Sequence, residues 1–190
     1  VLEPNITFHM SLGMRRDGWG FESSETCRIT DKRAECFANV ERGLKVIDCA
    51  SFIAAPLAAT VLSDFGADVI KIEPPGVGDP LRKWRKLKDG TSLWWHVQSR
   101  NKRSVTLDLK AAEGQEIVSQ LVAEADILVE NFRPGTLEEW GLGWDELSKL
   151  NPRLIMLRIS GYGQTGPYRD LPGFGVIGEA MGGLRHLSGY

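Results

Sequence analysis

The stretch that most constrains the fold is residues 43–75, which read as a strand, a helix and a second strand in succession. Two short β-branched runs, residues 44–47 and 69–72, flank a helical stretch that we expect to begin at Ser51. Short apolar runs of this kind are typical of parallel strands that are covered on both faces. The stretch therefore predicts one βαβ unit of an open parallel sheet.

The same alternation of short β-branched runs and longer helical runs continues along the chain, which is the pattern of repeated βαβ units. Ser51 is a candidate N-cap and Gly66 a candidate stop for the first helix. Residues 111–123 form a second helix, with Ile117, Leu121 and Val122 on one apolar face. We therefore predict an α/β fold, a mostly parallel Rossmann-like open sheet with flanking helices, whose strands lie near residues 44–49, 68–73, 103–108, 126–131 and 154–159.

A ligand site is expected where the first strand passes into the first helix. In open parallel sheets, ligands bind beyond the carboxyl ends of the strands, and a helix N-terminus there offers N–H groups to an anion. The backbone amides of Ser51, Phe52, Ile53 and Ala54 are the natural cradle for a nucleotide phosphate. The alternative is that Ser51 only caps the helix and Phe52 only fills the core. Because a Gly-x-Gly-x-x-Gly fingerprint is absent, an NAD-dependent oxidoreductase is disfavoured.

Composition narrows the class of partner. With 23 basic and 25 acidic residues, the formal charge of −2 gives no polyelectrolyte signature, so neither nucleic acid nor an anionic membrane is expected as a partner. Three cysteines without Cys-x-x-Cys spacing argue against a disulfide framework and against a zinc or other metal site. A reducing, cytoplasmic setting fits best. No apolar run approaches the roughly 20 residues that span a bilayer, and a signal-peptide pattern is absent.

Between residues 74 and 93 the chain is rich in Pro, Gly, Lys and Arg and reads as an excursion away from the sheet. Its basic side chains could contact the phosphates of a ligand or simply be solvated, and charge runs are more often solvated. These side chains are Arg82, Lys83, Arg85, Lys86 and Lys88.

The run 43–75 closely resembles the opening of the class III coenzyme A transferases, the CaiB/BaiF family, which is related to formyl-CoA transferase, carnitine CoA-transferase and α-methylacyl-CoA racemase. The resemblance spans residues 43–190, and five ordered blocks at family-like spacing are a specific signal. The four further blocks are NKRSVTLDLK (101–110), DILVENFRPG (126–135), GLGW (141–144) and SGYGQTGP (160–167). The resemblance implies an N-terminal CoA-binding α/β domain over residues 43–190 that looks truncated at its C-terminal end, whereas residues 1–42 remain an unassigned extension or linker.

The residues Asn131, Phe132 and Arg133 follow a predicted strand and therefore lie at its carboxyl edge. An amide, an aromatic face and a guanidinium suit an adenine ring with nearby phosphates. The resemblance implies that Asn131 and Phe132 line the CoA site, as do residues 51–54. Leu107 and Asp108 match positions beside the nucleotide, although Leu107 could equally be core and Asp108 a turn residue.

Two positions depart from relatives that place an arginine near the nucleotide: Pro74 and Glu139 stand there instead. The phosphate contacts must then differ. Arg103, Arg133 or the basic residues between 82 and 88 could compensate, and the sequence does not choose among them.

The glycine-rich loop 161–167 borders the acyl group in the resembled family, which implicates Gly161, Gly163, Gln164 and Thr165. Its glycines permit the backbone angles of a tight turn. Gln164 and Thr165 could orient a carboxylate or merely satisfy the loop's own backbone. The related racemases carry a histidine and an aspartate where this chain has Phe174 and Gly175, and proton abstraction needs a titratable group.

The resemblance implies CoA transfer from an acyl-CoA donor to a carboxylic acid through an enzyme-bound aspartyl thioester. CoA and acyl-CoA would then be substrates, with no permanently bound cofactor, and an interlocked homodimer is implied. We expect the aspartate beyond Tyr190, so this chain alone would be inactive; the carboxylates of Asp48, Glu73, Glu130 and Glu179 suit strand ends or helices better. The alternatives are a non-catalytic CoA-binding module or an acyl-CoA racemase or isomerase.

Overall fold

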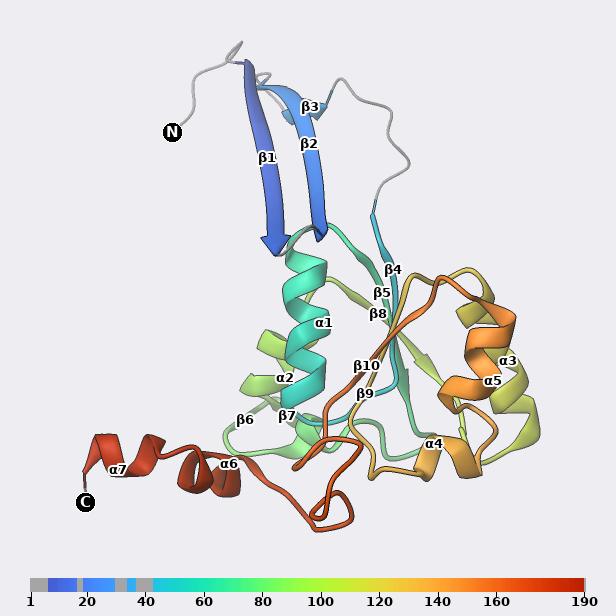
Figure 1. Ribbon diagram of the computed structural model, residues 1–190. Coiled ribbons are helices and arrows are strands. Elements are labelled where there is room, and N and C mark those ends of the chain that lie inside the picture. The colour runs from blue at the N-terminus through green and yellow to red at the C-terminus, as the bar shows by residue number, and fades with distance from the viewer. Residues whose placement is uncertain (1–6, 17–18, 30–33, 37–42, 190) are drawn as a thin grey trace. The chain divides into compact units, whose positions relative to one another are not determined.

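The computed structural model describes residues 7–16, 19–29, 34–36 and 43–189, and the chain divides into two compact units, Val1–Arg42 and Gly43–Tyr190. In the first unit, three strands form an antiparallel sheet in the order β1-β2-β3 (Figure 1). Their bounds are Thr7–Arg16 for β1, Trp19–Ile29 for β2 and Ala34–Cys36 for β3.

The second unit is built on a five-stranded sheet in the order β10-β9-β4-β5-β8, in which every neighbouring pair is parallel. All five predicted strands and the α/β class are confirmed. The three central strands are rich in Val and Ile, whereas the two edge strands, KRSVT and IMLR, contain fewer β-branched residues. The bounds are Lys45–Asp48 for β4, Asp68–Glu73 for β5, Lys102–Thr106 for β8, Ile127–Glu130 for β9 and Ile155–Arg158 for β10.

Helices flank this sheet on both faces, with α1 and α2 on one side and α3 and α5 on the other (Figure 1). The excursion between β5 and α2 contains a short 3₁₀ helix, η1 (Pro80–Lys83), and a two-stranded ribbon of β6 (Leu87–Lys88) and β7 (Thr91–Ser92). The α-helices are α1 (Ala54–Asp64), α2 (Leu93–Gln98), α3 (Ala112–Ala123), α4 (Thr136–Glu139), α5 (Trp144–Leu150), α6 (Gly175–Met181) and α7 (Leu184–Ser188).

Helix α1 begins three residues later than predicted, and the prediction of Ser51 as its N-cap is wrong. The N-cap position is Ile53, which supplies no side-chain hydrogen bond. The helix cannot extend back to Ser51 because Phe52 lies in the left-handed region, at φ 69°. The predicted stop is confirmed, since Gly66 directly follows the C-cap at φ 97°, a conformation that glycine adopts without steric cost.

The apolar face predicted for α3 is confirmed at Val122, which is buried, and at Leu121, which packs partly buried against the core, but the face is rotated away from Ile117. The buried row is Gly114, Val118 and Val122, whereas Ile117 is 41% exposed. The close approach of Gly114 to the Asp108 carbonyl decides the rotation, because a Cβ at this position would lie 2.0 Å from that oxygen. The side of α3 that packs against the segment after β8 therefore carries a glycine, which has no side chain to clash.

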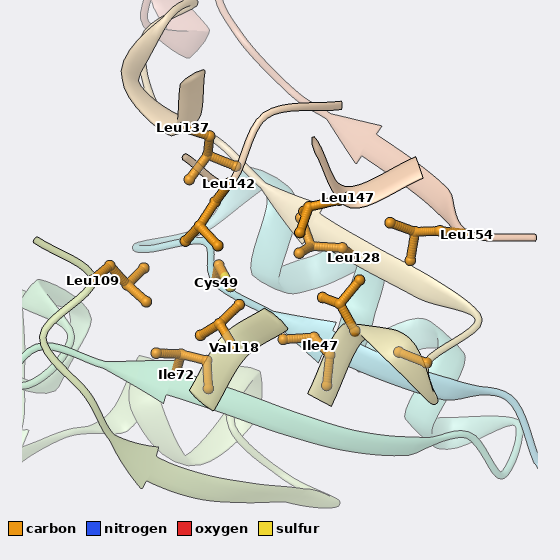
Figure 2. Close-up of a cluster of buried hydrophobic side chains, with 12 residues drawn as sticks. Ile47, Cys49, Ile72, Leu109, Val118, Leu128, Leu137, Leu142, Leu147 and Leu154 are labelled. Carbon is orange, nitrogen blue, oxygen red and sulfur yellow. The ribbon is translucent and has the colours of Figure 1, made fainter. Parts of the chain in front are cut away.

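Two hydrophobic clusters cover the two faces of the sheet. The larger cluster packs α3, α5 and the segment around α4 against Ile47, Ile72 and Leu128 of the strands (Figure 2). The smaller one packs Ala55 and Ala59 of α1 against Val46, Val69 and Val129. The sheet is thus buried on both faces at its centre, as expected of a parallel sheet.

The order of the strands creates a topological switch point between β4 and β9. From β4 the chain goes on to β5 and β8 on one side, and then crosses to β9 and β10 on the other. In open α/β sheets, ligands bind in the crevice at the carboxyl ends of the strands at such a point. The segments that follow β4 and β9 are therefore where a site is expected.

Candidate functional site

The segments after β4 and β9 are joined directly at the switch point. The Ser51 N–H donates to the Asn131 side-chain oxygen at 2.8 Å, and the Asn131 amide nitrogen donates to the Ser51 carbonyl at 2.8 Å. The structure thus brings the two predicted segments into contact. This pair of bonds also occupies the Ser51 amide, so that donor is not available to a phosphate.

The Phe52 amide is occupied as well. Its N–H donates to the Asp79 carboxylate, at 3.1 Å from Oδ1 and 3.2 Å from Oδ2. In the part of the chain that the structure describes, no hydrogen bond uses the N–H groups of Ile53 or Ala54. The predicted cradle is thus narrower than the sequence suggested: two of its four amides are free, at the start of α1, where the helix dipole favours an anion.

A buried cluster of four charges lies under the first turn of α1. Lys71 Nζ is 3.2 Å from Asp79 Oδ2 and 3.9 Å from Asp48 Oδ1, and Lys102 Nζ is 2.9 Å from Asp48 Oδ2. Both ammonium groups also donate to the backbone, Lys71 to the Ala50 carbonyl and Lys102 to the Pro56 carbonyl. All four side chains are almost fully buried. Burial lowers the pKa of Lys102, although the nearby Asp48 carboxylate opposes this shift.

The carboxylate of Glu73, at the end of β5, is enclosed by donors. Arg82 donates to both of its oxygens at 2.7 Å, Ser104 donates to Oε1 at 2.5 Å, and the Asp79 N–H donates to Oε2 at 2.9 Å. Burial acts to raise the pKa of Glu73, but these hydrogen bonds outweigh it and lower the pKa to about 2. The Glu73 carboxylate thus holds Asp79 and Arg82, in the excursion after β5, against the end of the strand.

Glu130, at the end of β9, has a similar role on the other side of the switch point. It accepts a bond from Arg158 at 2.7 Å and one from the Phe132 N–H at 2.7 Å. Another nitrogen of Arg158, Nη1, donates to Glu138 Oε1 at 2.6 Å. Burial raises the pKa of Glu130, and the bond from Arg158 opposes this shift. Asp48, Glu73 and Glu130 are thus all engaged in structural bonds, while Glu179 pairs with Arg185 at 3.3 Å on the surface.

The other predicted side chains of the β9 segment differ in their environment. Phe132 packs edge-on against Trp140, with ring centroids 5.2 Å apart, at the margin of the larger hydrophobic cluster. Arg133 is exposed, and none of the ion pairs among the described residues involves it. Of the arginines suggested for phosphate contact, Arg133 and Arg85 are in none of the ion pairs among the described residues, and Arg85 stacks on Trp84. Arg82 is committed to Glu73, and Arg103 pairs with Asp68 at 2.5 Å near the amino end of β5.

Leu107 and Asp108, predicted beside the nucleotide, directly follow the edge strand β8. Leu107 packs against the larger hydrophobic cluster, and its N–H donates to the Glu73 carbonyl at 3.0 Å. The Asp108 side chain accepts from the Lys110 N–H at 3.0 Å, as in an Asx turn. Both residues have sufficient structural roles, and β5 and β4 separate their strand from β9.

The glycine-rich loop follows β10 and so lies at the same edge of the sheet. Gly161 contacts Gly173 so closely that a Cβ on Gly161 would be 2.4 Å from the Gly173 Cα, and Gly163 has φ 83°. Gln164 reaches Ser160 Oγ at 3.4 Å, and Thr165 is exposed. The loop is thus shaped by its glycines, and both polar side chains can turn toward a ligand.

Sequence reasoning missed the residues that hold the site together, Asp79, Lys71 and Lys102. A lysine in the middle of the apolar run Val69–Ile72 was the available signal, because a charge in a strand that is covered on both faces must find a buried partner. The sequence pattern indicates only an excursion away from the sheet around Asp79 and Pro80. The structure shows Asp79 instead as the buried N-cap of η1, with Pro80 at the first helical position.

Comparison with known proteins places this geometry in a family. The model of CoA-transferase family III matches residues 42–190. The chain belongs to CoA-transferase family III. Over 148 residues it is 59% identical to the succinyl-CoA–D-citramalate CoA-transferase of Chloroflexus aurantiacus, covering 77% of this chain and 37% of that protein. It is 42% identical over 154 residues to the succinate–glutarate CoA-transferase of Agrobacterium fabrum, covering 77% and 38%.

The fold agrees with solved structures of the same family. A CaiB/BaiF family protein from Brucella suis superposes with a TM-score of 0.70 at 42% sequence identity, over 74% of this chain and 38% of that one. This family chain thus spans a little over one third of the length of the curated relatives that it matches. Among the described residues, no helix is long and apolar enough to cross a bilayer.

Proposed function

We propose that the protein containing this chain transfers coenzyme A from an acyl-CoA donor to a carboxylic acid acceptor, and that residues 43–190 form its N-terminal CoA-binding α/β domain. The observation that carries the proposal is the junction of the β4 and β9 segments through Ser51 and Asn131 at the topological switch point, in a chain of this family. CoA and acyl-CoA are its substrates, and no permanently bound cofactor is proposed.

The nucleotide end of CoA would bind at the carboxyl edge of β4 and β9. Ile53 and Ala54 supply unpaired N–H groups for a phosphate at the start of α1, and Arg133 supplies an unpaired guanidinium. Phe132 offers an aromatic face for the adenine, while Leu107 and Asp108 border the site. The acyl group would extend toward the loop after β10, past Gly161, Gly163, Gln164 and Thr165.

The transfer would proceed by attack of an aspartate carboxylate on the thioester, through a mixed anhydride to an enzyme-bound aspartyl thioester. Asp48, Glu73 and Glu130 are poor candidates for this nucleophile because each is buried and already bonded to a cation. We place the aspartate after Tyr190 in the whole protein, so the 190-residue chain by itself would bind CoA without turning it over.

The donor and acceptor are proposed from the names of the relatives. The two curated relatives described above are named for succinate or succinyl-CoA with citramalate or glutarate, all of which are dicarboxylic acids or their thioesters. Succinyl-CoA as the donor and a dicarboxylic acid as the acceptor are therefore the first pair to test. We further propose a cytoplasmic enzyme that acts as an interlocked homodimer.

The test uses the full-length native protein with succinyl-CoA and a panel of mono- and dicarboxylic acids, with the products analysed by mass spectrometry. A new acyl-CoA, together with a hydroxylamine-sensitive CoA adduct on an aspartate after Tyr190, is the expected result. Retained CoA binding without any new thioester would contradict the transferase and favour a non-catalytic module or an isomerase. An adduct on Asp48, Glu73 or Glu130 would contradict the assignment of the nucleophile.

A further inference from the structure

We infer that Asp79 is a positioning residue for CoA: its carboxylate holds the turn at Phe52, and thereby the two unpaired amides of Ile53 and Ala54, in the shape that receives a phosphate. This inference rests on the proposed function. Asp79 does not reach the ligand in our assignment, and acts through the backbone of the turn.

The turn needs an external anchor. Phe52 is not glycine, yet it adopts φ 69°, where a Cβ crowds the backbone, and no hydrogen bond of the α1 helix supports it. Strained residues of this kind persist only when surrounding contacts over-determine them, and they cluster at ligand sites. The Phe52 N–H bonds to Asp79, 27 residues further along the chain, provide that contact.

Asp79 is itself held from several directions, so it is a rigid anchor. Its N–H donates to Glu73 Oε2 at 2.9 Å, its Oδ1 accepts the Leu81 N–H at 2.8 Å, and Lys71 Nζ lies 3.2 Å from Oδ2. The residue is 2% exposed. The ring of Phe52 packs edge-on against Trp84, with centroids 4.9 Å apart, so the excursion holds the turn at its side chain as well.

The charges around Asp79 make this anchor compatible with an anionic ligand. A lone carboxylate under a phosphate site would repel the ligand, but Asp79 and Asp48 are matched by Lys71 and Lys102 in the same buried cluster. The cluster therefore fixes the turn without adding net negative charge beneath it. This pairing explains why two lysines are buried next to the start of α1.

The experiment uses calorimetry to measure how Asp79→Asn changes the CoA affinity of the full-length protein in three backgrounds: wild-type, Phe52→Ala and Phe52→Gly. Phe52→Ala and Phe52→Gly both delete the ring, but only glycine adopts the positive φ without strain. We expect Asp79→Asn to raise the Kd for CoA about tenfold in the wild-type and Phe52→Ala backgrounds, and less than about threefold in the Phe52→Gly background. An equal factor in both Phe52 backgrounds would overturn the inference, because a purely structural or electrostatic role does not depend on the strain at residue 52.

Two further measurements distinguish a failure of this inference from a failure of the proposed function. Asp64→Asn is the matched control, because Asp64 pairs with Arg100 at the opposite end of α1, and it should change the Kd less than about twofold. Hydrogen exchange of the wild-type protein should show a protected Phe52 amide; exchange as fast as in an open loop would overturn the inference even if Asp79→Asn does not fold. If the wild-type protein does not bind CoA at all, both the proposed function and this inference are wrong. Normal CoA binding by a folded Asp79→Asn variant would instead contradict the inference alone.

Discussion

The carboxyl edge of β4 and β5 and the segment after β10 contrast in how their shape is determined. At the first region, Asp48, Lys71, Glu73 and Asp79 are buried and bonded to one another or to backbone groups. In the second, from Ser160 to Gly189, no residue is buried, and α6 and α7 bury none of their side chains. One end of the proposed site is therefore organised by contacts within this chain, and the other end is not.

The difference indicates how the proposed ligand would be divided between rigid and adaptable parts of the site. A nucleotide with a constant shape suits a preorganised cradle, since ordering it in advance lowers the cost of binding. The acyl group, which changes between donor and acceptor, would face a loop whose shape depends on glycines rather than on packed side chains. Substitutions should accordingly be costly in the first region and mild in the second.

The largest effect is expected for Lys71→Met, which leaves Asp79 and Asp48 buried with one fewer cation. Removing one partner of a buried ion pair typically costs about 3–5 kcal/mol of unfolding free energy. Urea unfolding of the 190-residue chain measures this loss. Lys45→Met is the control, because the Lys45–Glu124 pair is exposed and should cost less than about 1 kcal/mol. Equal effects of the two substitutions would contradict the rigid character of the β4–β5 edge.

Glu73→Gln comes next, with an expected loss of about 2–3 kcal/mol at pH 7, because the half-buried Arg82 loses its charge partner at a buried position. The pKa of Glu73 is lowered from 4.5 to about 2, so its stabilising effect is fully present above about pH 4.5 and disappears as the pH falls toward 2. Unfolding of both forms across this pH range should therefore show their difference shrinking with acid. A constant difference from pH 7 to pH 2 would exclude the ionic contribution.

Asn131→Ala should cost about 1–2 kcal/mol of unfolding free energy, because the Ser51 amide and carbonyl both lose their partner. It should also weaken CoA binding, since the β4 and β9 segments are no longer joined. Asn151→Ala is a matched control, because its side chain also bonds only to backbone groups: it donates to the Val122 and Ala125 carbonyls and accepts from the Arg153 N–H, away from the site. Calorimetry with CoA should find a loss of affinity for the first variant only.

The smallest effects are expected after β10. Phe174 is 77% exposed and Leu187 82% exposed, so Phe174→Ser and Leu187→Ser should each change the stability of the 190-residue chain by less than about 0.5 kcal/mol. Leu147→Ala, in the larger hydrophobic cluster, should instead cost about 2–5 kcal/mol. A loss above about 1 kcal/mol for either serine variant would show that the segment packs within the chain, and the contrast between the two regions would no longer hold.

Much of the fold could be predicted from the sequence because its signals are local. Short runs rich in Val and Ile predict the central strands, and Gly66 predicts the end of α1, since each depends on the conformational preferences of a few neighbouring residues. The start of α1 was missed for the same reason: nothing local to Phe52 indicates a positive φ, which is held by a carboxylate 27 residues away. The rotation of α3 likewise depends on a carbonyl of another segment that faces Gly114.

The sequence by itself determined the α/β class and the family resemblance, and it directed the proposed site to the segments that follow β4 and β9, because these follow from periodicity and from motifs read along the chain. Only the tertiary structure decided which donors remain for a ligand. Ser51 is bonded to Asn131, Phe52 to Asp79, and Lys102 to the buried Asp48, and each of these contacts joins residues far apart in the sequence. The physical reason is that a buried polar group must find its partner in space, wherever along the chain that partner lies.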